Sequence, residues 1–384
     1  MEGLRERIRE YLELRSSAGT AYVKYSFMER LPSVRSIVFD CDGVLIDEKT
    51  SYDQVIREVT VRLVTLLTGF EIAESAIPSE VIYAVRSVGS FNNDCDTVTL
   101  LVEWIVDMVS EKNGKALQER LEKLEGKTVK EFGEVLKTHQ KIGSLDEKQV
   151  VEWFKQLERK VSPLEGTAAM LNEVESKLGI NSKAVATAKK ILNYPGRYGE
   201  SLLTTLFEEA FYGSEEASKL RGSGPFFTLE GRLKNERLLV NMETLERLYE
   251  RGFRMGISTG RGSWETWRTL GRLSELFEKE ACIFVGDRVT AEPQNREKYE
   301  KPSPWSLLEA VKNLPSQGDV LYVGNSVEDY VMFTRAKDYV NRILFGGVYG
   351  QDMELAYFFI ESGADAVIPS VNMLPKILDL LEES

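Results

Sequence analysis

The spacing of strand-like segments is the feature of this sequence that most restricts its fold. Short apolar runs that end in small or polar residues predict five buried strands, over residues 36–40, 253–259, 281–287, 319–325 and 341–346. The first lies near the start of the chain, whereas the others lie in its final third. A further short strand is expected at residues 364–368.

Helical patterns separate these later strands. They cover residues 264–276, 304–313, 327–336 and 352–362. Strands that alternate with helices predict βαβ units and hence a parallel sheet. We therefore expect an α/β fold built on a doubly wound, Rossmann-like parallel sheet.

The middle of the chain has a different pattern, with amphipathic helical stretches and few strand-like runs. The stretches cover residues 52–67, 79–88, 97–111, 129–140, 147–160 and 168–178. Because the first strand precedes this block and its expected sheet partners follow it, residues 49–235 are predicted to form a large, mainly α-helical cap inserted after the first strand. Residues 36–48 and 236–384 then form the α/β core. Residues 1–35 are expected to be a helical extension of unknown role.

Composition restricts the partners. The formal net charge of −12 gives no general attraction to nucleic acid or to an anionic membrane, although a small anionic ligand is compatible with it. The apolar runs are short and interrupted by acids, so no membrane span is predicted. The first ten residues lack the apolar stretch of an export signal, and three scattered cysteines do not form a disulfide framework. A cytoplasmic protein is expected.

Two acidic residues follow the first strand, in the segment Asp40-Cys-Asp-Gly43. Ligands of doubly wound sheets bind beyond the carboxyl ends of the strands, where Asp40 and Asp42 are expected to lie. One carboxylate can attack phosphorus, while a second protonates the leaving oxygen and then activates water. Taken alone, the pair also fits a solvated turn.

Three other strand ends carry polar residues that suit phosphoryl chemistry. Thr259, with Ser258 as the alternative, and Gly260 offer a hydroxyl and main-chain amides for phosphate oxygens. Lys301 can neutralise a nucleophile and a transferring phosphoryl group. Asn325, Glu328 and Asp329 offer oxygen ligands for Mg²⁺. Each segment read alone also fits a helix cap or a solvated loop.

In this order the four elements resemble the haloacid dehalogenase superfamily, over roughly residues 36–48 and 240–370. The helical insertion resembles the members whose cap enters just after the first motif. The resemblance implies an Mg²⁺-dependent phosphatase with Asp40 as nucleophile and Asp42 as general acid/base. It also implies phosphate binding by Thr259, Gly260 and Lys301, and metal binding by Asp40, Asp42, Asn325 and Asp329.

Two positions refine what the resemblance implies. Family dehalogenases lack a second acid at the position of Asp42, so phosphatase and phosphomutase chemistry remain. Asn325 stands where aspartate is frequent, which implies weaker metal binding or compensation by Glu328. Asn325 also motivates a third hypothesis, a binding or regulatory protein on an inactive scaffold.

The cap is expected to select a small phosphorylated substrate. Arg86, Asn92, Asn93 and Arg197 are the candidate contacts, because they combine basic and amide side chains with breaks in the helical pattern. On general grounds, a turn between helices with an Asn cap is the favoured explanation of the first three. The sequence predicts neither the natural substrate nor the oligomeric state.

Overall fold

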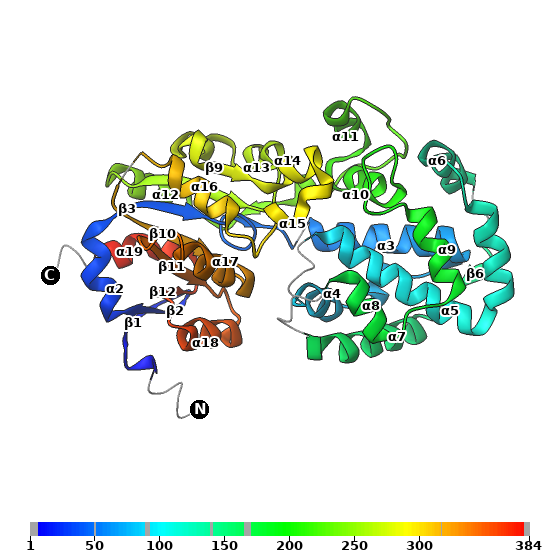
Figure 1. The fold of residues 1–384 in the computed structure, drawn as a ribbon, viewed down its shortest axis with the longest axis horizontal. Coiled ribbons are helices and arrows are strands. Elements are labelled where there is room, and N and C mark those ends of the chain that lie inside the picture. The colour runs from blue at the N-terminus through cyan, green and yellow to red at the C-terminus, as the bar shows by residue number, and fades with distance from the viewer. Residues whose placement is uncertain are drawn as a thin grey trace. The chain divides into compact units, whose positions relative to one another are not determined.

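The computed structural model describes residues 7–49, 51–88, 93–138, 141–164, 170–315 and 317–379. The chain divides into two compact units (Figure 1). The α/β unit comprises residues 1–48 and 236–384, and the helical unit comprises residues 49–235.

An eight-stranded sheet forms the centre of the α/β unit. Its strands are β1 (Tyr11–Ser16), β2 (Gly19–Lys24), β3 (Val34–Phe39), β8 (Arg254–Thr259), β9 (Cys282–Phe284), β10 (Asp319–Gly324), β11 (Ile343–Val348) and β12 (Ala366–Ile368). Their order is β1-β2-β12-β11-β10-β3-β8-β9, and neighbours from β12 to β9 run parallel. The predicted Rossmann-like parallel sheet is confirmed. Its central strand β3 lies between β10 and β8, which come much later in the sequence.

Helices cover both faces of this sheet (Figure 1). Residues of β10 alternate between two apolar cores, with Leu321 and Val323 in one and Val320 and Tyr322 in the other. The first core includes side chains of α12 (Met242–Glu250), α13 (Ser263–Leu270) and α19 (Leu374–Asp379). The second includes side chains of α16 (Trp305–Asn313), α17 (Val327–Lys337) and α18 (Met353–Ser362).

The prediction of a helical extension over residues 1–35 was wrong. Strands β1 and β2 form an antiparallel hairpin, and β2 adds to the edge of the sheet through pairing with β12. A short helix, α2 (Tyr25–Arg30), and a 3-10 turn at Leu31–Ser33 follow this hairpin. The reason is tertiary, since Ala21 and Val23 become fully buried through this pairing.

The predicted strand over residues 281–287 is shorter than expected. Strand β9 ends at Phe284, and helix α14 (Val285–Ala291) begins at the next residue. A second short helix, α15 (Arg296–Tyr299), precedes the turn that carries Lys301. Among the described residues, β9 lies at the sheet edge and pairs with β8 alone, so little holds the chain extended beyond it.

The helical unit is built around α5, which contacts α3 and α9. Its helices are α3 (Tyr52–Thr68), α4 (Ser79–Arg86), α5 (Asp94–Leu124), α6 (Val129–Thr138), α7 (Glu147–Val161), α8 (Leu171–Leu178), α9 (Lys183–Leu192), α10 (Leu202–Tyr212) and α11 (Ser214–Arg221). A two-residue parallel ladder joins β5 (Phe70–Glu71) to β6 (Gly143–Ser144). The mainly α-helical character expected of this region is confirmed.

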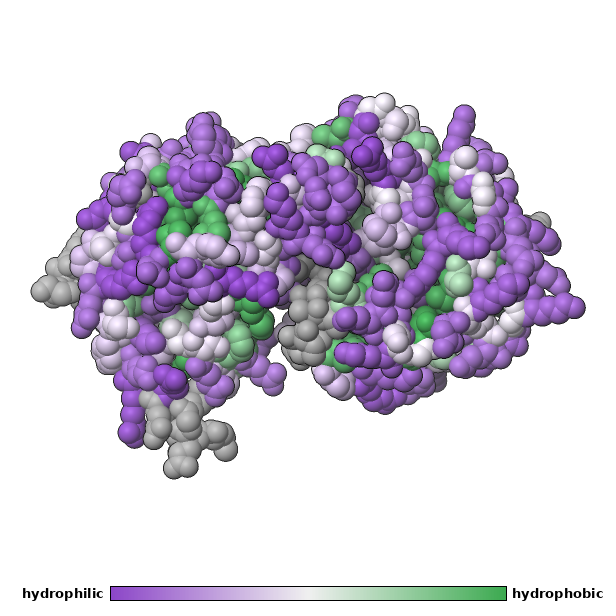
Figure 2. All heavy atoms as spheres, viewed as in Figure 1, coloured by the Kyte–Doolittle hydropathy of each residue, from purple (hydrophilic) through white to green (hydrophobic). Residues whose placement is uncertain are grey.

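The surface of each unit is largely polar on the face seen in Figure 2, where hydrophobic residues form small separate groups. No helix among the described residues combines the length and apolarity that crossing a membrane requires.

Candidate active site

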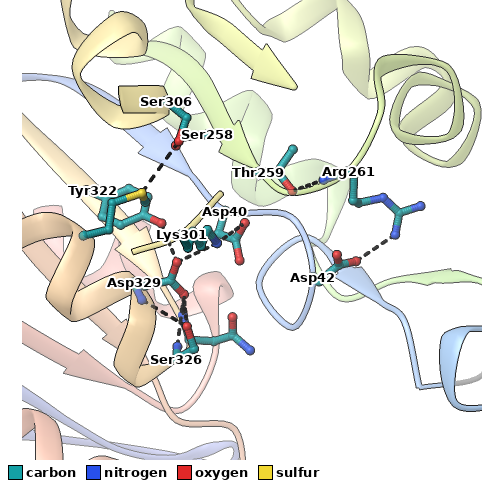
Figure 3. A network of polar contacts seen from close by, with 12 residues as sticks. Asp40, Asp42, Ser258, Thr259, Arg261, Lys301, Ser306, Tyr322, Ser326 and Asp329 are labelled. Carbon is teal, nitrogen blue, oxygen red and sulfur yellow. Dashed lines mark hydrogen bonds and ion pairs between the residues drawn. The ribbon is translucent and has the colours of Figure 1, made fainter. Parts of the chain in front are cut away.

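Asp40, Lys301 and Asp329 form a buried ionic cluster at the carboxyl edge of the sheet (Figure 3). Asp40 follows β3 directly, and its main-chain N–H donates to the Val323 carbonyl oxygen of β10 at 2.8 Å. Lys301 Nζ lies 2.9 Å from Asp40 Oδ1 and 2.6 Å from Asp329 Oδ1. Asp40 and Asp329 therefore meet because β3 and β10 are neighbours in the parallel sheet, and Lys301 reaches both from the turn between α15 and α16.

Asp329 is the best satisfied member of this cluster. Its Oδ1 accepts bonds from Lys301 Nζ and from the Tyr322 hydroxyl, each 2.6 Å long. Its Oδ2 accepts from the main-chain N–H groups of Asn325 and Ser326, at 2.9 and 3.1 Å, and from the Ser326 hydroxyl at 2.8 Å. Burial opposes its ionisation, but Lys301 and these bonds outweigh burial and lower the pKa of Asp329. Asp329 thus fixes both Lys301 and the loop after β10.

Asp40 is in a different electrostatic position. Burial raises the pKa of Asp40 to about 7, with the charges of Asp329 and Asp42 acting in the same direction and Lys301 opposing them. Burial disfavours the charged lysine, yet the two carboxylates raise the pKa of Lys301 above its usual value. A carboxylate poised near neutrality and held by a fixed ammonium is typical of a catalytic group.

Asp42 points away from this cluster and faces Arg261 (Figure 3). Arg261 Nη1 donates to Asp42 Oδ1 at 2.7 Å. The Asp42 side chain is 33% exposed, whereas that of Arg261 is 1% exposed. Sequence reasoning did not give Arg261 a side-chain role, although a charged residue just beyond a buried strand is the signal that marks it.

The two hydroxyl residues at the end of β8 lie in different surroundings. Ser258 donates to the buried Ser306 hydroxyl at 2.9 Å, so it belongs to the core. Thr259 accepts from the Arg261 main-chain N–H at 3.3 Å. The main chain at Gly260 is exposed, since a Cβ there would meet nothing within 4 Å. Of the two hydroxyls, Thr259 remains the candidate for phosphate binding.

Asn325 lies against the turn that follows Asp40. A Cβ at Gly43, whose φ is +69°, would meet Asn325 Nδ2 at 2.0 Å, so glycine permits this close approach. Gly324 has a similar role, because a Cβ there would lie 2.5 Å from Asp329 Cβ. The loop after β10 therefore packs tightly on the loop after β3.

The donor chemistry of these loops fits Mg²⁺. No group of three or more His, Cys, Asp or Glu suited to a metal occurs among the described residues. Mg²⁺, however, is usually held by one or two carboxylates together with other oxygens and water. Of the predicted ligands, Asp40 and Asn325 can supply such oxygens together with Glu328. Asp42 instead faces Arg261, and Asp329 already accepts bonds from Lys301, Tyr322 and Ser326. Burial raises the pKa of Glu328 to about 8, and the charges of Asp329, Asp40 and Glu300 act in the same direction against Lys301, so this region carries an excess of negative charge. A divalent cation would offset that excess.

The predicted substrate contacts of the helical unit have varied surroundings. Arg86 donates to Asp53 at 2.8 Å and to Asp94 at 2.7 Å, and the Asn93 side chain accepts from Cys95 N–H at the start of α5. Asn92 lies outside the described residues. Arg197 is exposed. Arg86 and Asn93 thus have structural roles, and the substrate role of all four residues stays a prediction.

Comparisons with known proteins concern the fold. No protein-family model and no curated protein matches this sequence. An X-ray structure from the Northeast Structural Genomics Consortium aligns with a TM-score of 0.55 and 19% identity, over 91% of this chain and 100% of that one. A phosphatase from Thermococcus thioreducens aligns with a TM-score of 0.45 and 20% identity, over 85% and 99%. An L-2-haloacid dehalogenase from Xanthobacter autotrophicus aligns with a TM-score of 0.31 and 14% identity, over 90% and 98%.

The strand order and the motifs it brings together carry the assignment of the fold. Strands β10, β3 and β8 are adjacent and parallel, and the acid pair, the hydroxyl and the Asn-Ser-Val-Glu-Asp segment follow their carboxyl ends. A helical unit interrupts the chain between β3 and β8. This arrangement agrees with the fold that the resemblance to the haloacid dehalogenase superfamily predicts.

Proposed function

We propose that this chain is a haloacid dehalogenase superfamily phosphatase that hydrolyses a small phosphomonoester with the aid of Mg²⁺. The observation that carries the proposal is the buried Asp40 carboxylate, held 2.9 Å from Lys301 at the carboxyl edge of the sheet, with Asp42 two residues away. Asp40 is the nucleophile and Asp42 is the general acid/base. These roles require two carboxylates in different surroundings, and Asp40 is buried where Asp42 is partly exposed.

In the first step, an Asp40 carboxylate oxygen forms a bond to phosphorus while the bond from phosphorus to the substrate's ester oxygen breaks. Asp42 donates its proton to that leaving oxygen, which departs as an alcohol. The enzyme then carries an acyl phosphate on Asp40. In the second step, Asp42 takes a proton from water, whose oxygen attacks phosphorus. The bond from phosphorus to Asp40 breaks, which releases phosphate and restores both carboxyl groups.

The remaining residues bind and orient the phosphoryl group. Lys301 offsets negative charge on Asp40 and on the transferring phosphoryl oxygens. Thr259 and the exposed main chain at Gly260 offer donors to phosphate oxygens. Asp40, Asn325 and Glu328 would hold Mg²⁺, which when bound supplies positive charge that favours attack by one anion on another.

The test is phosphate release from p-nitrophenyl phosphate by the parent protein and by Asp40→Asn, each with Mg²⁺ and with EDTA. Turnover is expected only for the parent with Mg²⁺, and the variant is expected to lose at least about 10⁴-fold in kcat. Equal rates in all four reactions would contradict the mechanism. Product isomers without free phosphate, measured on sugar phosphates, would instead indicate a phosphomutase.

A further inference from the structure

Arg261 forms a buried link between two carboxylates of the α/β unit. Its Nη1 donates to Asp42 Oδ1 at 2.7 Å, and its Nη2 donates to Glu236 Oε2 at 2.8 Å. The same Glu236 oxygen accepts from the Thr269 hydroxyl at 2.7 Å. The side chains of Arg261 and Glu236 are each 1% exposed. A buried cation and a buried anion therefore stand behind the partly exposed Asp42.

The contacts of Arg261 indicate that it orients the Asp42 carboxylate, because its own charge is already balanced by Glu236. Glu236 already neutralises the guanidinium, so Asp42 is not needed to compensate a buried charge. A planar guanidinium presents its N–H groups in a rigid fork, and Glu236 together with Thr269 fixes the plane of that fork. The Nη1 group then holds one oxygen of Asp42, which leaves the other oxygen for proton exchange.

The position of Arg261 along the chain links it to the rest of the site. Thr259 ends β8, and its hydroxyl accepts from the main-chain N–H of Arg261. One turn thus carries the candidate phosphate-binding hydroxyl and the residue that orients Asp42. Glu236 is the first residue of the chain after the helical unit and immediately precedes β7 (Arg237–Leu238).

We propose that Arg261 is a positioning residue for proton transfer by Asp42, held in place by Glu236. This inference rests on the proposed function, in which Asp42 protonates the leaving oxygen. Without the guanidinium, Asp42 keeps its carboxyl group but loses its fixed direction. The loss affects poor leaving groups, which need a proton, far more than p-nitrophenolate, which leaves without one.

The experiment compares kcat/KM for p-nitrophenyl phosphate and for an alkyl phosphate in a set of variants. For Arg261→Gln, we expect about a 100-fold loss on the alkyl phosphate and less than about a 5-fold loss on the aryl phosphate. The aryl-to-alkyl ratio should rise as it does in Asp42→Asn. Arg261→Lys, which keeps the charge but not the fork, should give an intermediate ratio.

Two further variants separate positioning from folding. Arg261→Gln leaves Glu236 as a buried charge, so the double variant Arg261→Gln with Glu236→Gln removes both charges and should show the same raised ratio. Arg254→Gln is the matched control, because Arg254 lies at the start of β8 and pairs with Glu278 at the surface. Its ratio should equal that of the parent.

The outcomes distinguish the inference from the proposed function. If the parent releases no phosphate from either substrate, the proposed function fails, and the inference fails with it. If the parent is active and the Arg261 variants lose equal activity on both substrates, or lose none, the proposed function stands and the positioning role is overturned.

Discussion

Each of the two units contains a lysine near two buried carboxylates. The units differ in the hydrogen bonds and ion pairs that these carboxylates make. In the α/β unit, Lys301 forms ion pairs with both Asp40 and Asp329, and Asp329 accepts further bonds from Tyr322 and Ser326. We call Asp40, Lys301 and Asp329 the core cluster. In the helical unit, Lys189 pairs with Glu175 and lies 3.8 Å from Glu103. We call Glu103, Glu175 and Lys189 the helical cluster.

This difference affects the acid with the fewest partners in each cluster, which is Asp40 in the core cluster and Glu103 in the helical cluster. Neither carboxylate oxygen of Glu103 has a hydrogen-bond partner among the described residues, and its side chain is fully buried. Burial, reinforced by Glu175, raises the pKa of Glu103 to about 9, whereas that of Asp40 rises only to about 7. An acid with a pKa of about 9 is neutral at physiological pH. The charge of an acid with a pKa of about 7 can be changed by a substrate or a metal. A lysine-dicarboxylate composition therefore does not by itself mark an active site.

Of the four changes that test this comparison, removal of the lysine of the core cluster is expected to have the largest effect. Lys301→Met should lower kcat/KM for p-nitrophenyl phosphate by about 10³-fold, because the phosphoryl group loses a fixed cation. It should also raise the pKa of Asp40, since Lys301 opposes the effect of burial, so the acidic limb of the pH–rate profile should move to higher pH. Rates measured from pH 5 to 9 test both effects, and an unchanged profile would contradict the role of Lys301.

The next largest effect concerns the acid of the helical cluster. Burial raises the pKa of Glu103 in the folded chain to about 9, whereas the ordinary pKa of a glutamate is 4.5. The unfolded chain therefore loses the proton first, and stability falls as pH rises between these values. Glu103→Gln should remove this loss and raise the free energy of unfolding at pH 7 by about 1 to 3 kcal/mol.

Urea unfolding at several pH values measures this prediction. The advantage of Glu103→Gln over the parent should grow as pH rises and become constant above about pH 9. Glu125→Gln is the control, because Glu125 pairs with Lys190 at the surface and its loss should have little pH-dependent effect. A pH-independent difference would show that Glu103 is ionised in the folded chain.

A third change adds a negative charge beside the core cluster. Asn325→Asp introduces a carboxylate beside the turn after Asp40, where it adds a charged ligand for a divalent cation. We expect the Mg²⁺ concentration for half-maximal rate to fall by about tenfold. Titration of the rate with Mg²⁺ measures this concentration. An unchanged or higher half-maximal Mg²⁺ concentration in the variant would exclude Asn325 from the metal site.

The smallest effect is expected from the lysine of the helical cluster. Lys189 is 39% exposed, and water already screens its charge. Lys189→Met should change the free energy of unfolding by less than about 1 kcal/mol and leave kcat/KM unaltered. A loss of activity comparable to that of Lys301→Met would remove the distinction between the two clusters.

The sequence predicts much of this structure because its strongest signals are local. Apolar runs with polar ends predict β3, β8, β10 and β11 to within a few residues, and helical periodicity predicts α3 and α7. The N-terminal hairpin could not be predicted in this way, because it is an edge addition stabilised by pairing with β12, whose strand is far away in sequence.

The chain itself determines which reactive groups are present and in what order. Asp40 and Asp42, Thr259, Lys301 and Asn325 follow strands or precede helices, and that order is written in the sequence. Tertiary structure alone decides what each group does. It places Lys301 between Asp40 and Asp329, turns Ser258 into the core, and brings Arg261 to Asp42. The physical reason is that burial and charge pairing depend on distances between strands, which no local pattern specifies.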